Sequence, residues 1–328
     1  MKFSIVIALY NKASYIGCAI DSVLAQSFRD FEVIVVDDGS TDDGPQMVAS
    51  ITDQRLRLVR QANAGVSVAR NQGIAMARGE WVAFFDADDW LHPAYLAGLL
   101  QAQQAHPDAD IVATSFVPIT HKDGPWPPRW PAVPQVAEVE RITDLPRRWM
   151  RGPAICASAT AVRTTRLKQM QPCFAPGESH GEDLDLWFRL AEHTPVALVT
   201  TALAAYRVSV KDSLTGQNGL ACPPYIERMQ QRAQSGCMTA AQRESALWFV
   251  AQHHVSIARL ALTLGKRREG WAWLLKGRRA VSNKRWWLTA AMACFFSKSM
   301  IDNWEQWRLR RALALSVPVP DHDLVKNR

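Results

Sequence analysis

The sequence predicts an α/β domain built on a mostly parallel sheet with helices on both faces, followed by a helical C-terminal region. Over roughly the first 210 residues, short runs rich in β-branched residues alternate with segments of helical periodicity. These runs are apolar without alternation, which is typical of strands that helices cover on both sides. At 328 residues and 48% hydrophobic content, the chain is long enough to form a large core.

Each early strand is followed by a helix, so neighbouring strands are expected to run parallel through right-handed crossovers. Ligands of such sheets bind beyond the carboxyl ends of the strands. The strands are expected at residues 3–9, 32–36, 56–60, 81–85 and 110–116, and the helices at 15–26, 45–51, 66–77 and 93–105.

Residues 121–150 interrupt this alternation. The prolines of DGPWPPRWPAVP remove backbone donors and restrict their neighbours, so we expect a surface loop without regular structure. Beyond it we expect a further strand near 157–163, an amphipathic helix at 183–193 and a long strand or strand pair at 195–208. The domains are therefore expected to be 1–220, the α/β domain, and 221–328, a helical region.

The C-terminal region is basic and rich in tryptophan. Residues 241–328 hold 16 Lys and Arg against 6 Asp and Glu, and seven of the 13 tryptophans. Basic side chains mixed with Trp are attracted to anionic membrane surfaces, so residues 266–287 are a candidate peripheral membrane contact. The alternatives are a helical subdomain that packs its tryptophans inside and, least favoured, nucleic-acid binding.

The cysteine pattern favours a cytoplasmic protein, which a membrane contact would place at the inner face of the cytoplasmic membrane. None of the six cysteines forms a CxxC pair or another metal-ligand spacing, as expected for reduced thiols. No segment reaches the 18 or so uninterrupted apolar residues of a membrane-spanning helix.

Acidic side chains crowd behind the fourth strand, where FFDADDW places Asp86, Asp88 and Asp89. Like charges at close range raise one another's pKa, so a cation is the simplest partner for them. Mg²⁺ and Mn²⁺ prefer such oxygen ligands and are commonly held by one or two carboxylates plus substrate phosphates. A solvated acidic turn, or capping of the next helix by Asp89, is the alternative.

Other strand ends and helix starts carry candidate ligand-binding groups. Asp37 and Asp38 follow the second strand and could accept hydrogen bonds from a nucleotide, although Asp and Gly also form turns. Arg70 begins a helix and could contact a diphosphate, or lie on the helix surface. Glu182 and Asp183 begin a later helix, where capping is the alternative role.

Four segments in this order and spacing resemble the family 2 glycosyltransferases. They are FSIVIALYNKASYIGCAIDSVLAQSF, VIVVDDGSTD, NAGVSVARNQGIAMARGEWVAFFDADDW and GEDLDLWFRL, and they cover roughly residues 1–210. The resemblance implies the nucleotide-sugar-binding GT-A fold, which is Rossmann-like. Processive members carry a QxxRW motif and spanning helices, and this sequence shows neither, which favours transfer of a single sugar.

Carried over by position, the resemblance implies a role for each candidate. It places Ala8, Tyr10 and Asn11 beside the nucleotide of a UDP-sugar donor. Asp38 would lie near the uracil and Arg70 near the base or phosphate. Asp86 and Asp88 would hold the ribose and the metal, and Asp183 would be the catalytic base. Glu182 is the first substitute for Asp183.

The implied reaction is inverting transfer to a hydroxyl of a glycan or lipid-linked acceptor, as in cell-surface polysaccharide or lipopolysaccharide biosynthesis. A divalent cation would neutralise the departing diphosphate, and a base would take the acceptor's proton. Two alternatives remain open. One is a haloacid dehalogenase-like phosphatase with Asp86 as nucleophile, and the other is a non-catalytic nucleotide-binding module.

Overall fold

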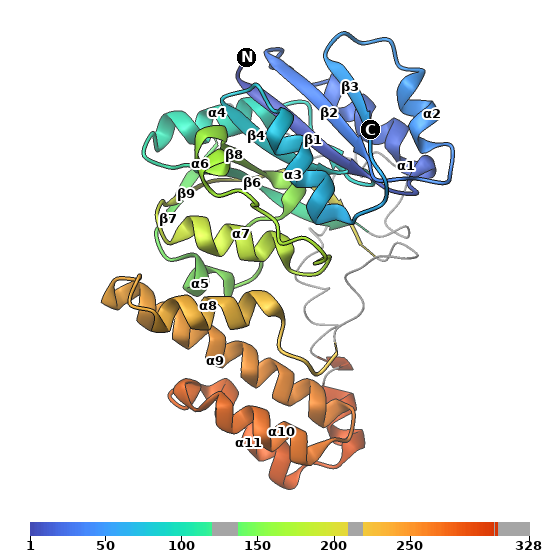
Figure 1. The fold of residues 1–328 in the computed structure, drawn as a ribbon. Coiled ribbons are helices and arrows are strands. Elements are labelled where there is room, and N and C mark those ends of the chain that lie inside the picture. Colours follow the sequence, from blue (N-terminus) through green and yellow to red (C-terminus); the bar gives the residue numbers. More distant parts are fainter. Residues whose placement is uncertain (120–136, 209–218, 305, 308–328) are drawn as a thin grey trace, which may run out of the picture. The chain divides into compact units, whose positions relative to one another are not determined.

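The structure is a computed structural model that describes residues 1–119, 137–208, 219–304 and 306–307 (Figure 1). Contacts divide the chain into two compact units. The first comprises residues 1–218 and 223–246, and the second comprises 219–222 and 247–328. The boundary therefore lies inside one helix, later than the expected position at 220.

A mixed sheet of nine strands forms the centre of the first unit in its described part, with β3-β2-β1-β4-β8-β6-β9-β5 as the strand order and β7 beside β9. The pairs β1–β2, β1–β4, β2–β3 and β6–β9 are parallel, as expected, whereas β8, β5 and β7 pair antiparallel. The strands are β1 Phe3–Leu9, β2 Phe31–Asp37, β3 Leu56–Arg60, β4 Trp81–Asp86, β5 Trp90–Leu91, β6 Ile111–Ile119, β7 Val139–Ile142, β8 Thr160–Arg163 and β9 Val196–Arg207.

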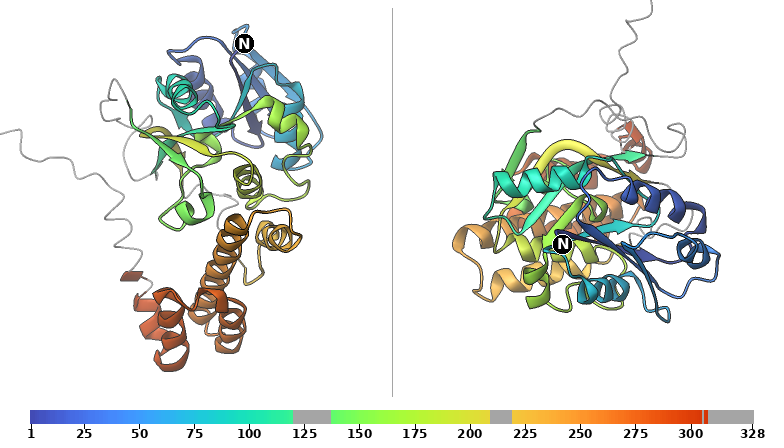
Figure 2. Two further views of the ribbon diagram at one scale, coloured as in Figure 1. Left: turned by 90° about the vertical axis from the view of Figure 1, so that its left-hand side faces the viewer. Right: turned by 90° about the horizontal axis from the view of Figure 1, so that it is seen from above.

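Helices cover both faces of this sheet (Figure 2). Odd-numbered residues of β1 pack with α1 and α4 into the main core, while Val6 faces α3 on the other side. The helices of the first unit are α1 Ala13–Leu24, α2 Gly44–Ala49, α3 Val66–Met76, α4 Tyr95–Ala105, α5 Leu145–Trp149, α6 Thr164–Gln169, α7 Glu182–Ala191 and α8 Pro224–Gln234, with the 3-10 turn η1 Ala157–Ala159.

The expectation of no regular structure over 121–150 is wrong for its last part. Residues 120–136, which contain most of the prolines, lie outside the described residues. Val139–Ile142 nevertheless forms β7 against β9, and Leu145–Trp149 forms α5. Pro146 does not prevent this helix because it occupies the first turn, where its missing N–H costs nothing. The side chain of Asp144 caps the helix by accepting from the Arg147 amide at 3.0 Å.

The second unit is helical, as expected. Most of α9 Ala240–Thr263 belongs to it, together with α10 Arg267–Lys276, the turn η3 Arg278–Ala280 and α11 Lys284–Phe295. Its small cores pack four of the tail's tryptophans, namely Trp271, Trp273, Trp286 and Trp304, at partly buried positions. None of the helices that the structure describes is both long and apolar enough to span a membrane.

The close packing of α3 on the sheet makes a stability prediction. A Cβ at Gly73 would lie 2.2 Å from Val6 Cγ1, so we expect Gly73→Ala to lower the free energy of unfolding by about 1–3 kcal/mol. Gly17→Ala in α1 is the matched control, because its Cβ would meet only Met47 Cε at 3.5 Å. That change should be neutral or stabilising, since Ala favours a helix over Gly. Equal urea midpoints for the two variants would contradict the prediction.

Candidate active site

One large cavity opens at the carboxyl ends of the parallel strands, where the topology places a ligand site. Its volume is about 1330 Å³. The first residues beyond β1, the end of β4 and the start of α7 all contribute to its wall. The candidate residues that line it are Ala8, Tyr10, Asn11, Asp38, Arg70, Asp86, Asp88, Glu182 and Asp183. Asp37 is the one predicted site residue outside this lining.

Arg70 connects the sheet to α7 at the floor of this cavity. Its Nη2 donates to Asp86 Oδ1 and its Nη1 to Glu182 Oε1, each at 2.7 Å. The guanidinium is buried, which disfavours its charge, but the two carboxylates outweigh this effect and raise the pKa of Arg70. The alternative of an Arg on the helix surface is therefore wrong, because the side chain points inward and holds two acids in place.

Asp38 organises the loop before α3. Its Oδ1 accepts from Gln61 Nε2 at 2.6 Å and from the Ala64 amide at 2.8 Å, and its Oδ2 accepts from the Gly65 amide at 2.8 Å. Gly65 adopts φ +92°, a backbone conformation that side chains with a Cβ rarely take. Asp38 therefore acts on the cavity largely through the loop that it fixes.

Asp37 does not line the cavity, so the structure gives no support to the nucleotide-binding role expected of it. The residue ends β2, is buried, and accepts from the Ser40 amide at 2.9 Å through Oδ1. This bond closes the turn after the strand, which was the alternative reading of the Asp-Asp-Gly sequence. The different placement of Asp37 and Asp38 follows from the pleat, because neighbouring residues at a strand end point to opposite sides.

Asn11 shapes the opposite rim. It adopts φ +50°, and its Oδ1 accepts from the Thr41 amide at 2.8 Å, which joins the turns after β1 and β2. Asn tolerates this left-handed conformation better than most residues. Tyr10 beside it is half exposed and lines the cavity. Ala8 pairs with Val36 and Asp86 in the sheet, so these strand ends are level with one another.

The three acids after β4 have different surroundings. Asp89 is buried, accepts from the Arg207 amide at 2.8 Å and also bonds Ser158. Burial, with Asp86 and Asp88 nearby, raises the pKa of Asp89 well above its usual range. Asp89 is thus a structural group inside the turn. Asp86 and Asp88 line the cavity instead.

Asp86 and Asp88 suit a divalent cation that a substrate also binds. No group of three or more His, Cys, Asp or Glu side chains suited to a metal occurs among the described residues, so these two would need oxygen ligands from a diphosphate. Asp86 uses Oδ1 for Arg70, and Asp88 Oδ2 accepts from Lys12 Nζ at 2.6 Å. One oxygen of each carboxylate thus lies outside these two contacts, and the donor set fits Mg²⁺ or Mn²⁺.

Asp183 lies in the first turn of α7, at the cavity wall. Its Oδ1 accepts from the Leu184 amide at 2.8 Å. Burial and the adjacent Glu182 carboxylate raise the pKa of Asp183 to about 6, although Arg70 acts against them. Asp183 is therefore ionised at neutral pH but close to its titration point. Glu182 differs because its carboxylate forms an ion pair with Arg70.

Several cavity residues were not predicted. Lys12 follows Asn11 directly, so its place after β1 was a usable signal. Arg207 Nε donates to the Asp88 carbonyl at 2.8 Å. The two residues are 119 positions apart, so no local sequence pattern predicts this contact. Arg148 and Trp149 come from α5, in the segment expected to lack regular structure.

Residues 4–164 match the family described as Glycosyl transferase family 2. This match lies within the first unit, covers just under half of the chain and confirms the resemblance to that family. Among curated family relatives, a putative glycosyltransferase EpsH of Bacillus subtilis is 36% identical over 115 residues, which are 34% of this chain and 33% of that protein. The succinoglycan biosynthesis protein ExoO of Rhizobium meliloti is 44% identical over 115 residues, 33% of each chain. The matches thus span about a third of these relatives.

The described fold resembles that of a solved structure. Residues 1–349 of S. aureus TarS, crystallised with UDP-GlcNAc, align with a TM-score of 0.68 at 20% identity, covering 94% of this chain and 92% of that chain. A structure of the same fragment with UDP aligns with a TM-score of 0.63 at 21% identity. The GT-A fold with a helical C-terminal portion is thereby confirmed.

Removing the positive charge of Arg70 should destabilise the fold. In Arg70→Gln, the carboxylate of Glu182 stays buried without its partner, so we expect the free energy of unfolding to fall by about 3 kcal/mol or more. Exposed Arg78, for which the structure gives no side-chain ion pair, provides the control variant Arg78→Gln. Chemical denaturation of both variants checks the difference. Similar stabilities would contradict the prediction and show that water solvates the Glu182 carboxylate when Arg70 is replaced.

Proposed function

We propose that the chain transfers one sugar from a UDP-sugar to a hydroxyl of a glycan or lipid-linked acceptor, with inversion at the anomeric carbon. The observation that carries the proposal is the single cavity in which Asp183 joins the strand-end residues Asp38, Asp86 and Asp88. The family match supports the reaction class, and the UDP-GlcNAc and UDP complexes of the TarS fragment support the donor class. ExoO supports a place in polysaccharide biosynthesis.

Each group in the cavity then has a task. Tyr10, Asn11 and the loop fixed by Asp38 would hold the nucleotide, while Arg70 orients Asp86. Mg²⁺ or Mn²⁺, held by Asp86 and Asp88 with the diphosphate, would neutralise the negative charge of the leaving group. Asp183 takes the proton of the acceptor hydroxyl as that oxygen bonds to the anomeric carbon and the bond to the β-phosphate breaks.

The alternatives are less well supported. The family match covers the segment that contains Asp86, and Asp86 is ion-paired with Arg70, which makes it a poor nucleophile for a phosphatase. A non-catalytic nucleotide-binding module remains distinguishable by experiment, because it would bind UDP-sugars without consuming them.

Asp183 provides the first test. We expect Asp183→Asn to keep donor binding while turnover falls about 100-fold or more, because the base is lost and the donor site is not. The wild-type rate should rise with pH through about 6, since only the ionised form of Asp183 accepts a proton. Rates measured from pH 4.5 to 8 check both points. Retained turnover in Asp183→Asn would move the role to Glu182, whose Gln variant is the companion measurement.

Chelation tests the metal. We expect exhaustive EDTA treatment to abolish transfer and added Mn²⁺ or Mg²⁺ to restore it, and Asp88→Asn to require a higher metal concentration, because one ligand is lost. Thermal stabilisation by UDP should also depend on the metal, since only ligands that favour the folded state raise the melting temperature. Undiminished activity in chelator would remove the metal from the proposal.

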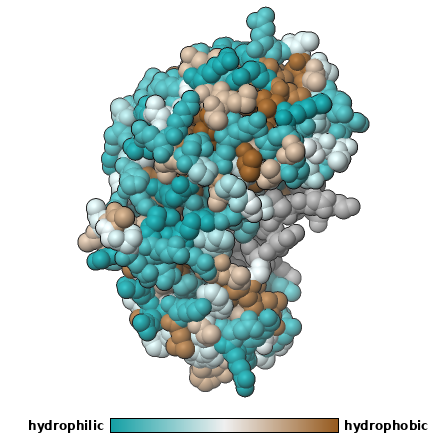
Figure 3. Space-filling model, in the orientation of Figure 1, coloured by the Kyte–Doolittle hydropathy of each residue, from teal (hydrophilic) through white to brown (hydrophobic). Residues whose placement is uncertain are grey.

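The second unit would bring the enzyme to a membrane-bound acceptor. On α11 the solvent-facing positions follow a helical spacing and are mostly apolar. They are Lys284, Trp287, Leu288, Cys294 and Phe295. The side chain of Trp287 is 60% exposed and that of Phe295 is 82% exposed, and Figure 3 shows hydrophobic residues at the surface among hydrophilic ones. Basic Lys276, Arg278 and Arg279 precede this helix.

An apolar helix face with basic neighbours matches the chemistry of an anionic lipid surface. The helical-subdomain alternative explains Trp271, Trp273, Trp286 and Trp304, which pack against the cores, but it leaves Trp287 and Phe295 unexplained. The contact would be peripheral and would lie at the inner face of the cytoplasmic membrane. It would extend slightly beyond residues 266–287, to the end of α11.

Vesicle flotation checks the membrane contact. The full chain should float with phosphatidylglycerol vesicles and far less with neutral phosphatidylcholine vesicles. The double variant Trp287→Ser, Phe295→Ser should bind about tenfold or more weakly, because two apolar side chains no longer enter the interface. Met47→Ser, at an exposed position of α2, is the matched control and should float like the wild type. Equal flotation of the double variant and the wild type would reject the contact.

A further inference from the structure

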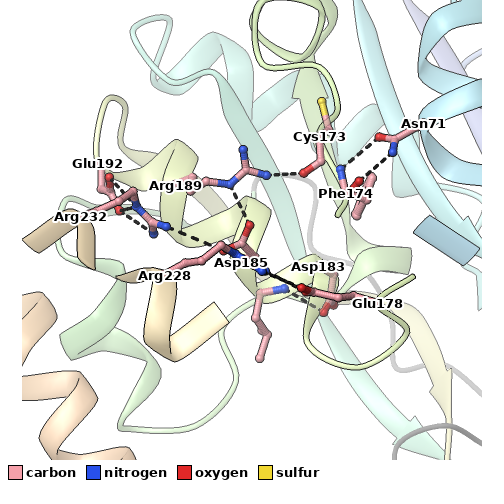
Figure 4. A network of polar contacts seen from close by, with 11 residues as sticks. Asn71, Cys173, Phe174, Glu178, Asp183, Asp185, Arg189, Glu192, Arg228 and Arg232 are labelled. Carbon is pink, nitrogen blue, oxygen red and sulfur yellow. Dashed lines mark hydrogen bonds and ion pairs between the residues drawn. The ribbon is translucent and has the colours of Figure 1, made fainter. Parts of the chain in front are cut away.

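Helix α8 begins 60 residues after the matched family segment ends, yet it packs against α7, whose first turn carries Asp183. Both helices belong to the first unit. The proposed chemistry gives α8 no task, and none of its residues lines the cavity. Its contacts with α7, with the residue that ends α7 and with the loop before α7 nevertheless include several ion pairs (Figure 4).

Arg228 of α8 forms a bidentate ion pair with Glu178 in that loop. Its Nη1 donates to Glu178 Oε1 at 2.6 Å and its Nη2 to Glu178 Oε2 at 2.8 Å, while its Nε donates to Asp185 Oδ1 at 3.1 Å. The fork of a guanidinium matches a carboxylate in this geometry better than a lysine could. These bonds raise the pKa of Arg228, so its charge is permanent. One side chain thus links α8 to the loop and to α7.

Asp185 makes the link hard to break. The residue is buried one turn inside α7, and its Oδ2 accepts from Arg189 Nε at 2.9 Å. Arg232 of α8 lies 3.8 Å from Asp185 Oδ1 and also pairs with Glu192 at 2.9 Å. A buried carboxylate needs these partners, because an unpaired charge there would cost several kcal/mol. The position of α7 therefore depends on α8.

The loop is held from the sheet side as well. The carbonyl of Glu178 accepts from Ser67 Oγ at 2.6 Å, and Ser67 lies one turn before Arg70 in α3. After Glu178 the chain runs through Ser179, His180 and Gly181, which line the cavity. Glu178 thus stands between α3 and α8, directly before the segment that forms the wall next to Asp183.

Tyr225 packs against the end of this loop. Gly181, immediately before α7, has φ +75°, and a Cβ there would lie 2.6 Å from Tyr225 Cδ1. The Tyr225 ring also stacks on Phe188 of α7, with ring centroids 6.4 Å apart. The glycine therefore lets the aromatic ring of α8 come close to the backbone at the start of α7.

We infer that Arg228 and Tyr225 of α8 are positioning residues of the active site, which hold segment 178–183 as the wall where the acceptor hydroxyl meets Asp183. The inference rests on the proposed function of Asp183. Because α8 touches the loop and α7 but not the cavity residues that would hold the nucleotide, it acts on the acceptor side. Its loss should reduce kcat and leave the KM for the donor nearly unchanged.

The pKa of Asp183 also depends on the position of this loop. Burial is the largest cause of its raised pKa. The charged or titratable groups that act on it electrostatically are Glu182 of α7, Arg70 of α3, Asp86 at the end of β4 and Cys156 before η1. None of these touches Arg228. If the loop relaxes, water reaches Asp183, and its pKa falls toward the ordinary value near 4.

The test compares Arg228→Gln with Arg243→Gln in the full chain. Arg243 is an exposed arginine of the same unit, and the structure gives its side chain no hydrogen bond or ion pair. In Arg228→Gln we expect kcat to fall about tenfold or more, since a small displacement of a catalytic group is costly, and donor KM to stay within about twofold. The acid limb of the pH–rate profile should move from about pH 6 to lower pH. Arg228→Lys should recover part of the rate, and Arg243→Gln should match the wild type.

Three results would overturn the inference. The first is an unchanged kcat and acid limb in Arg228→Gln with only a lower melting temperature. The second is a loss of activity caused by a higher donor KM. The third is an undisturbed rate in Glu178→Gln, a second variant that removes the loop's partner and leaves the Arg228–Asp185 contact in place. A rate decrease in both single variants that does not add in the double variant would support the inference.

Hydrogen exchange separates this inference from the proposed function. Without any substrate, amides of residues 178–184 should exchange faster in Arg228→Gln than in the wild type, while α3 stays protected. If the wild type shows no transferase activity but this exchange difference appears, the proposed function fails and the role of α8 in holding the loop stands. If the wild type is active and the exchange is unchanged, the inference alone fails.

Discussion

The contact on which the site depends is the buried guanidinium of Arg70 between Asp86 and Glu182. Asp86 ends a strand of the sheet, and Glu182 begins α7, so one cation joins the two walls of the cavity. Without it, the carboxylate of Glu182 would be buried and unpaired at low dielectric, and the partly exposed carboxylate of Asp86 would lose its ion-pair partner. The same contact leaves Asp183, the next residue, turned toward the cavity and without an ion pair in the structure.

Around that contact, acids with similar sequence contexts acquire different properties. Asp86 and Asp88 line the cavity, where a cation and a diphosphate could reach them, whereas Asp89, one residue further, is buried against Ser158 and the Arg207 amide. Asp37 and Asp38 separate in the same way into a turn former and a loop organiser. In each pair of neighbouring acids, one carboxylate lines the cavity and the other is held away from it by its own hydrogen bonds.

The sheet and most site residues were predictable because their signals are local. Apolar runs marked β1 to β4, and the ends of parallel strands meet at one edge, so Asn11, Asp38 and Asp86 had to lie near one another. The wrong assignments within 121–150 have one local cause and one non-local cause. Pro146 starts a short helix, and β7 forms because the edge of β9 is available, neither of which a proline-rich composition reveals. The contact of Arg228 with Glu178 spans 50 positions.

The division of the chain inside α9 matters for the design of chimaeras. Early residues of that helix still belong to the catalytic body, since Gln242 Nε2 donates to the Glu192 carbonyl at 2.7 Å and Ser245 Oγ donates to Asp144 Oδ1 at 2.6 Å. A chimaera that borrows another protein's tail should therefore be joined after residue 246. A joint at the visible change in composition near 220 would replace the helix that braces α7, and the hybrid would lose turnover for reasons unrelated to its new tail.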